Sequence, residues 1–261
     1  MRRALVVFLA VSAVSGLVAL KGALEDRGGE SVASAADVDV AEALKGLWNK
    51  YPGGELGDPV RFYYCHDDGV GLYRYGRLGF TNTNSYDWSV EGDVLKLRFR
   101  KTGKTHEVHF SLEEGGKVLV LKEDPKEPGS ARYVKERAPV DVDMAPFGAP
   151  AGSMWIDAKE YATGGSGFSI YQLASAAIDG RGIGWHHRGD FDDWSTEALR
   201  YRLDGDRLSL RFELSGERHT TRFQMEGGEK GSLLLAEDPR NWWQRSRFKY
   251  MGKSFEAAWA E

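Results

Sequence analysis

Apolar residues recur at every second position in two well-separated stretches of the chain. In the first, Leu95, Leu97 and Phe99 alternate with basic side chains. In the second, Leu208, Leu210 and Phe212 alternate with polar and charged side chains in the same way, and Leu214 continues the series. This period is typical of β-strands that bury one face. Both stretches are therefore predicted to form antiparallel strands.

The two stretches are copies of one pattern, the first from Gly92 to Pro125 and the second from Gly205 to Pro239. In both copies a glycine, Gly103 or Gly216, lies between two predicted strands, where a hairpin turn needs a residue that tolerates positive φ. The repetition predicts a duplicated domain. The matched positions are Gly92-Asp93 with Gly205-Asp206, Leu97 with Leu210, Phe99 with Phe212, Gly103 with Gly216, His106 with His219, Phe110 with Phe223, and Asp124-Pro125 with Asp238-Pro239.

The duplication divides the rest of the chain. We expect a first domain at 44–137, a short linker at 138–151 that contains three prolines, a second domain at 152–251, and a C-terminal tail at 252–261. Each domain is long enough for a small core of its own.

The N-terminus has the pattern of a targeting segment. Arg2 and Arg3 precede an uncharged, mainly apolar run at 4–20, which predicts an export signal or a membrane anchor. Residues 21–43 are rich in Gly, Ser, Ala and acids, and we expect them to form a flexible stem. The predicted location is therefore periplasmic, secreted, or tethered to the membrane by residues 4–20.

The amino-acid composition favours a β-rich protein and argues against nucleic-acid binding and cysteine-based sites. The 32 glycines and the aromatic content of 12% fit many short strands joined by tight turns. The formal charge is -4 and basic residues are scattered along the sequence, so no nucleic-acid partner is predicted. The single cysteine, Cys65, rules out an internal disulfide and the common cysteine-based zinc sites, and we expect it to be a packing residue.

A Gly-x-Trp opening followed by consecutive strands resembles lipocalin-like (calycin-type) domains, in particular the short ones of exported bacterial proteins. Gly46-Leu47-Trp48 carries this motif, and Gly152-Ser153-Met154-Trp155 carries it with one extra residue. The resemblance implies an all-β chain of two tandem small antiparallel up-and-down β-barrels, with a small apolar or amphipathic molecule as the ligand class. We expect Trp48 and Trp155 to plug one end of each barrel.

Candidate binding residues follow from parity and from the repeat. His106 and His219 occupy the same position of the repeat, and the strand alternation points both toward the interior. Each therefore either binds a ligand headgroup at a barrel mouth or is hydrogen-bonded to a turn carbonyl. The adjacent His186 and His187 point to opposite faces of a strand, and no metal site is predicted there. Trp242 lies with Trp243 among arginines and suits a ligand rim, a partner surface or a membrane interface. The residues expected to bind ligand are Tyr64, Tyr75, His106, Tyr171, His186, His219 and Trp242.

Three functional hypotheses remain open. No catalytic or metal-binding motif with the right context is present, so we expect a non-enzymatic exported binding protein without cofactor or metal. The alternative is a structural or protein-interaction ectodomain of the cell envelope with packed barrels, which acts through its loops around Trp194 and Trp242. A third is an enzyme that uses an inward-facing histidine as acid or base. Interior volume separates the first two, because a cavity on the order of 300 Å³ or more would favour binding.

Overall fold

The computed structural model describes residues 35–52, 54–136, 140–141, 150–162, 165–174, 179–228, 230–254 and 257–258. The predicted signal or anchor at 1–20 lies outside these residues, as do residues 21–34 of the predicted stem, most of the linker and half of the tail. In the described part, no helix has both the length and the apolar character needed to cross a membrane.

The described chain begins with a helix, α2 (Ala35–Leu44), in the last part of the segment expected to be a flexible stem. Its C-terminal end is docked: Leu44 is fully buried, and its carbonyl accepts a hydrogen bond of 2.6 Å from the indole of Trp48. The ammonium group of Lys135 donates to the carbonyl of Ala43 at 2.7 Å. A helix this short is marginal in water by itself, so tertiary contacts of this kind, invisible in the local pattern, account for it.

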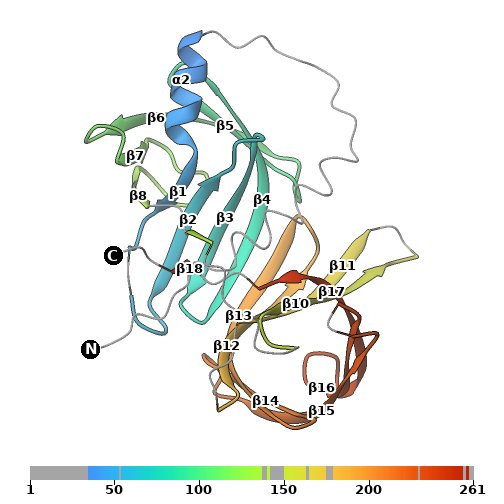
Figure 1. Ribbon diagram of the computed structural model, residues 1–261. Helices are drawn as coiled ribbons and strands as arrows, with labels where there is room; N and C mark the ends of the chain where they lie inside the picture. The colour runs from blue at the N-terminus through green and yellow to red at the C-terminus, as the bar shows by residue number, and fades with distance from the viewer. Residues whose placement is uncertain are drawn as a thin grey trace.

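The next eight strands form a closed antiparallel β-barrel, called here the first ring (Figure 1). Each strand pairs with its neighbour in sequence, and the pairing of β1 with β8 closes the barrel. The strands are β1 (Gly46–Asn49), β2 (Pro59–Cys65), β3 (Val70–Arg77), β4 (Phe80–Glu91), β5 (Val94–Phe99), β6 (Thr105–Glu113), β7 (Val118–Leu121) and β8 (Ala131–Glu136).

The further strands from β10 to β17, called here the second ring, pair in the same order, and β10 also pairs with β17. Two short strands, β9 (Val140–Asp141) and β18 (Ala257–Ala258), pair separately. The strands of the second ring are β10 (Ser153–Glu160), β11 (Ser166–Leu173), β12 (Arg181–Gly189), β13 (Asp193–Asp204), β14 (Arg207–Phe212), β15 (Arg218–Glu226), β16 (Ser232–Asp238) and β17 (Gln244–Lys253).

The two rings share one ladder of hydrogen-bonded strands, because the first half of β4 pairs with the first half of β13. The register of this seam is symmetric. Asn82 lies opposite Ser195, and these two residues hold the same place in the two copies, 113 positions apart as Gly92 and Gly205 are. Such a self-complementary contact is what a twofold homodimer uses. The seam therefore joins the copies as two equivalent halves.

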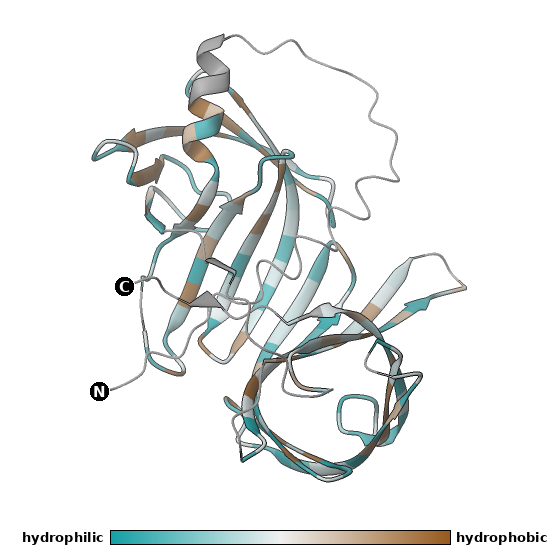
Figure 2. Ribbon diagram, viewed as in Figure 1, coloured by the Kyte–Doolittle hydropathy of each residue, from teal (hydrophilic) through white to brown (hydrophobic). Residues whose placement is uncertain are grey.

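The three larger clusters of buried apolar side chains lie inside and between the rings. The alternation seen in the sequence sends Leu95, Leu97 and Phe99 into the first ring and Leu208, Leu210 and Phe212 into the second. Figure 2 shows the resulting alternation of hydrophobic and hydrophilic residues along the strands. The third cluster, called here the inter-ring core, packs the outer faces of the two rings against each other, and contains Leu47, Val60, Phe62, Val70, Leu72, Leu78, Met154, Phe168, Ile170 and Trp194.

The tryptophans of the Gly-x-Trp motifs are fully buried at the starts of β1 and β10. Trp155 donates from its indole to the carbonyl of Pro150 at 3.0 Å, five residues back, whereas Trp48 reaches four residues back to Leu44. The extra residue of the second motif thus lengthens the segment before the tryptophan, and the hydrogen bond from the indole to a preceding carbonyl is present in both copies.

Candidate functional site

A buried aspartate, the first residue of an Asp-Pro dipeptide, lies at an equivalent place in both rings, after β7 in the first and at the end of β16 in the second. Asp124 is 6% exposed and accepts hydrogen bonds from the phenols of Tyr63, at 2.9 Å, and Tyr133. Asp238 is 1% exposed and accepts one from Tyr171 at 2.8 Å. Burial, assisted by the nearby carboxylate, raises the pKa of each of these phenols, so they keep their protons and donate. We call these two ends of the rings the first and second mouths.

A lysine covers the interior at the first mouth, two residues after the aspartate. The ammonium nitrogen of Lys126 lies 3.8 Å from the ring centroid of Phe99 and 5.5 Å from that of Tyr73. It also donates to the amide oxygen of Asn84 on β4 at 3.3 Å. Burial lowers the pKa of Lys126. The cation thus lies on the aromatic core as a cation–π contact.

The second mouth repeats this arrangement with an arginine. The guanidinium carbon of Arg240 lies 3.5 Å from the ring centroid of Phe212. Arg240 donates to Glu197 on β13, the equivalent of Asn84, at 2.7 Å and to Glu217 at 3.1 Å. Burial raises the pKa of Glu197 even though Arg240 opposes this shift.

His106 and His219 lie at these mouths, at matching positions. The imidazole of His106 meets Phe99 edge-on, and that of His219 meets Phe212 in the same way, with centroids 5.9 Å apart in both pairs. Burial, then Lys126 and Lys104, lower the pKa of His106. The Nε2 atom of His219 is buried without a hydrogen-bond partner in the described part of the chain.

His186 and Tyr171 are brought together inside the second ring. Their ring centroids are 4.8 Å apart, and His186 Nε2 lies 2.9 Å from the hydroxyl of Ser169. Burial, with Arg240 and Arg188 as smaller causes, lowers the pKa of His186 to about 3. The side chain therefore stays neutral in the pH range where an acid or base of ordinary histidine chemistry would work.

The alternation of the strand places His187 on the opposite face of β12 from His186. Its Nδ1 lies 2.9 Å from the hydroxyl of Thr196, and its Nε2 lies 3.2 Å from the amide oxygen of Gln172. Both imidazole nitrogens of His187 thus lie within hydrogen-bond distance of neutral groups, and this arrangement indicates a role in holding the strands together.

The two remaining tyrosines expected to bind ligand differ in place. Tyr75 lies inside the first ring and stacks on Tyr73 with centroids 5.4 Å apart. Tyr64 packs instead against the inter-ring core, on the outer face of β2. The structure therefore does not bring Tyr64 to either mouth, and the neighbouring Tyr63 takes the inward place.

Trp242 and Trp243 form the rim of the second mouth. Their φ angles are 53° and 63°, a left-handed conformation that bulky residues rarely adopt. The turn that holds them is anchored to Asp238, whose carbonyl accepts from the backbone of Asn241 and Trp243 at 3.0 Å each. Trp243 packs on His219 with centroids 4.6 Å apart, while Trp242 is 81% exposed.

Cys65 and Trp194 are both core residues. Cys65 is 2% exposed and its sulfur lies 3.4 Å from the phenol oxygen of Tyr86; burial raises the pKa of the thiol to about 12, which keeps it protonated. Trp194 is 2% exposed and belongs to the inter-ring core, so the structure places it on a buried part of β13 and not in a loop.

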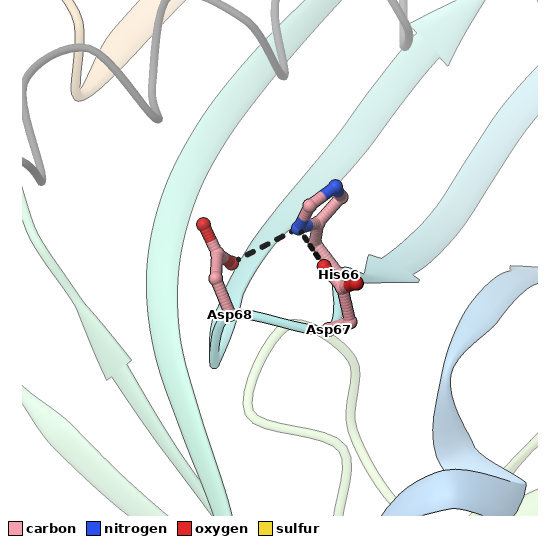
Figure 3. Close-up of side chains that lie close together, drawn as sticks. All are labelled: His66, Asp67 and Asp68. Atoms are coloured by element: carbon pink, nitrogen blue, oxygen red, sulfur yellow. Dashed lines mark ion pairs between the residues drawn. The ribbon is translucent and has the colours of Figure 1, made fainter.

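A third cluster of polar side chains lies in the turn between β2 and β3 (Figure 3). His66 Nδ1 is 2.7 Å from a carboxylate oxygen of Asp67 and 3.1 Å from one of Asp68. The same Asp68 oxygen accepts from the backbone of Val70 at 3.0 Å, as turn-forming aspartates commonly do. These three consecutive residues supply at most three ligands, and turn formation explains their geometry.

The residues that define the mouths are not among the binding residues predicted from the sequence; they are Asp124, Lys126, Asp238 and Arg240. The Asp-Pro dipeptide is visible in both copies as a matched pair, but the match does not show that its carboxylate is buried. A basic residue follows it in both copies, and this shared charge was the available signal.

Comparisons with known proteins add no relative: no family model, curated protein or solved structure matches this chain.

Proposed function

We propose that this chain is a non-enzymatic binding protein that works outside the cytoplasm, built from two tandem lipocalin-like barrels that serve as packed scaffolds. Its contact with a cell-envelope partner is proposed to be the rim formed by Trp242 and Trp243. The apolar run at 4–20 after Arg2 and Arg3 supports export. The repeat and the symmetric seam support a duplicated barrel.

The densely packed interior favours a barrel that acts as a scaffold over a barrel that binds a ligand inside. A cavity wide enough for water would leave accessible area on the side chains around it. The large side chains inside the first ring are at most 2% exposed, and the mouth is covered by Lys126. An apolar ligand would have to displace side chains that are packed as in an ordinary core. These interior residues are Trp48, Tyr63, Tyr73, Tyr86, Phe99 and Tyr133.

The observation that carries the proposal is the conformation of the tryptophan rim. Holding two bulky residues at positive φ costs free energy, about 1–3 kcal/mol each, and such strain persists where surrounding structure enforces it. Here the anchor is the buried Asp238, and the outcome is an indole in solvent. Tryptophan, with tyrosine and arginine, is enriched among the residues that dominate binding energy at protein interfaces.

Photo-crosslinking tests this proposal. A benzoylphenylalanine placed at Trp242, in cells that produce the protein, should yield a discrete crosslinked partner. The same group at Tyr51, which is 39% exposed on the first ring, is the control and should give none. Equal yields from both positions would remove the rim from consideration.

The substitution Trp242→Gly gives an independent check. Glycine adopts the left-handed conformation without strain, so the variant should be more stable than the parent by about 1 kcal/mol. It should also abolish the partner adduct formed by a benzoylphenylalanine at Trp243. Saturable one-to-one binding of an apolar dye such as N-phenyl-1-naphthylamine, unchanged in this variant, would favour a ligand inside the barrels instead.

A further inference from the structure

Basic residues that are scattered along the sequence gather on one face of the second ring. The outward positions of β12 to β15 carry seven arginines, although the whole chain has a formal charge of -4. The pairing register places them side by side: Arg181 lies opposite Arg202, and Arg200, Arg211 and Arg218 form a second row across three strands. Arg207 and Arg222 extend the face by one further pair.

Five of these arginines line a cleft of about 540 Å³. Both rows line it, and the row of Arg181 and Arg202 continues across β14 and β15 with Ser209 and Thr220, whose hydroxyls lie 2.9 Å apart. Adjacent strands are about 4.8 Å apart and alternate residues along a strand about 7 Å apart, so the arginine side chains start from regularly spaced backbone positions. The five arginines are Arg181, Arg200, Arg202, Arg211 and Arg218.

Acids neutralise part of this face. Arg181 pairs with Asp179 at 3.2 Å, Arg200 with Glu213 at 3.1 Å, and Arg222 with Asp206 at 3.9 Å. Over the residues that the structure describes, Arg202, Arg211 and Arg218 have no carboxylate within ion-pair distance, and all three are exposed. The cleft therefore presents positive charge that is available to an anion.

The fold itself does not require these arginines, because the first ring has the same strand order with mostly other residues at the equivalent positions. The positions 113 residues earlier are Asp68, in the turn before β3, and Asp87, Ser89, Arg98 and Thr105, on β4 to β6. The equivalent face of the first ring thus carries two acids and one arginine, and that arginine lies 3.4 Å from Asp87. A barrel of the same strand order forms with either set, which separates the arginine cleft from the requirements of folding.

We propose that the arginine cleft binds a linear acidic glycan, a sugar chain that carries carboxylate or sulfate groups. Guanidinium groups bind such anions bidentately, and a row of them fits charges repeated along a chain. The hydroxyls of Ser209 and Thr220 supply neutral hydrogen bonds for sugar hydroxyls. This inference goes beyond the proposed function, because the cleft and the tryptophan rim consist of different side chains.

The chemistry of the cleft favours a glycan over other polyanions. Single-stranded nucleic acids are held by aromatic side chains that stack on bases. The aromatic rings of this segment, Tyr201 and His219, belong to the inward-facing set, and Tyr201 is 2% exposed. A flat lipid surface would leave a recessed cleft of this size unfilled.

Isothermal titration of the full chain with a heparin hexasaccharide tests the proposal. The triple variant Arg202→Ser, Arg211→Gln, Arg218→Thr borrows two residues from the first ring. It should bind about tenfold more weakly or worse, because three charge-assisted contacts are lost. Its unfolding transition should match that of the parent, since all three side chains are exposed.

The matched control changes the same charge elsewhere, as Arg77→Gln, Arg132→Gln, Arg247→Gln, and should keep the parent affinity. Equal weakening in both triples would mean general attraction by net charge and would overturn the proposal. So would tighter binding of poly(U) RNA or of phosphatidylserine vesicles than of the hexasaccharide. Success or failure of the crosslink at Trp242 leaves this result unaffected, so the two proposals fail separately.

Discussion

His186 and His187 are adjacent on β12 and nearly inaccessible, at 4% and 1% exposed, but they face opposite sides of the sheet. Burial lowers the pKa of His186 from 6.5 to about 3 and lowers that of His187 as well. Arg240 and Arg188 add to the effect at His186, and Arg74 at His187. At the scale of single residues, the environment has converted two titratable groups into neutral hydrogen-bonding ones.

A pH dependence of stability follows. Because the folded-state pKa of His186 is lowered, the unfolded chain binds a proton between pH 6.5 and about 3 that the folded chain does not bind. The free energy of unfolding should therefore fall as pH falls through this window, by about 1.4 kcal/mol per pH unit for such a group. Urea unfolding at pH 7, 5.5 and 4.5 should show a smaller loss for His186→Gln than for the parent.

The exposed His109 supplies the control for this measurement. Its side chain is 59% exposed, and His109→Gln should leave the pH dependence close to that of the parent. A loss of stability on acidification that is identical in His186→Gln and the parent would show that His186 accepts a proton in the folded protein.

At the scale of elements, close contacts between glycines and aromatic rings let neighbouring strands curve around the interiors. Gly71 on β3 lies directly opposite Tyr86 on β4, and Gly182 on β12 opposite Tyr201 on β13. A Cβ atom at Gly71 would lie 2.2 Å from the ring of Tyr86, which is fully buried. The tyrosine thus occupies the space that a side chain on the neighbouring strand would fill.

The substitution Gly71→Ala should destabilise the chain by about 1–3 kcal/mol, because Tyr86 would have to leave its packed position. Gly252→Ala is the matched control, since the nearest atom to its added Cβ, on Met154, would lie 3.6 Å away. Chemical denaturation of both variants measures the difference. Equal stability of the two would contradict the packing described for Tyr86.

The alternation of the sequence predicted the strands but not always the face they bury. Leu97 and Phe99 were placed correctly because the residues between them are charged. On β2 the two faces are both buried, one inside the first ring and one in the inter-ring core, so Tyr63 and Tyr64 look alike in the sequence. The alternation of apolar and polar residues along a strand shows which face is buried only where the other face is exposed to water.

Long-range pairing was equally hidden from the sequence. The seam is centred on Asn82 and Ser195, two polar residues that carry no hydrophobic signal, and its register becomes visible only once the strands are paired. The mouths show the same limit. Asp124 and Tyr63 are 61 positions apart, and their hydrogen bond depends on the closure of the barrel.

At the scale of the whole molecule, the inter-ring core and the seam should make the two rings unfold as one cooperative unit. Phe62 from the first ring and Ile170 and Trp194 from the second belong to the same buried cluster, and β4 pairs directly with β13. Opening either ring would expose part of this core and would unpair the seam. Stability should therefore be shared between the rings, as it is in one domain.

Hydrogen exchange measures this sharing. Peptides from β6 in the first ring and from β15 in the second should report the same free energy of global opening in the parent chain. The substitution Phe62→Asp places a charge in the inter-ring core, where burial without a partner is costly, so the rings should then open with different free energies. Leu56→Asp, at a leucine that is 44% exposed, is the control and should leave the two values equal. Separate opening energies in the parent chain would mean that the seam and the inter-ring core contribute little, and that the symmetric register of β4 and β13 joins two independent domains.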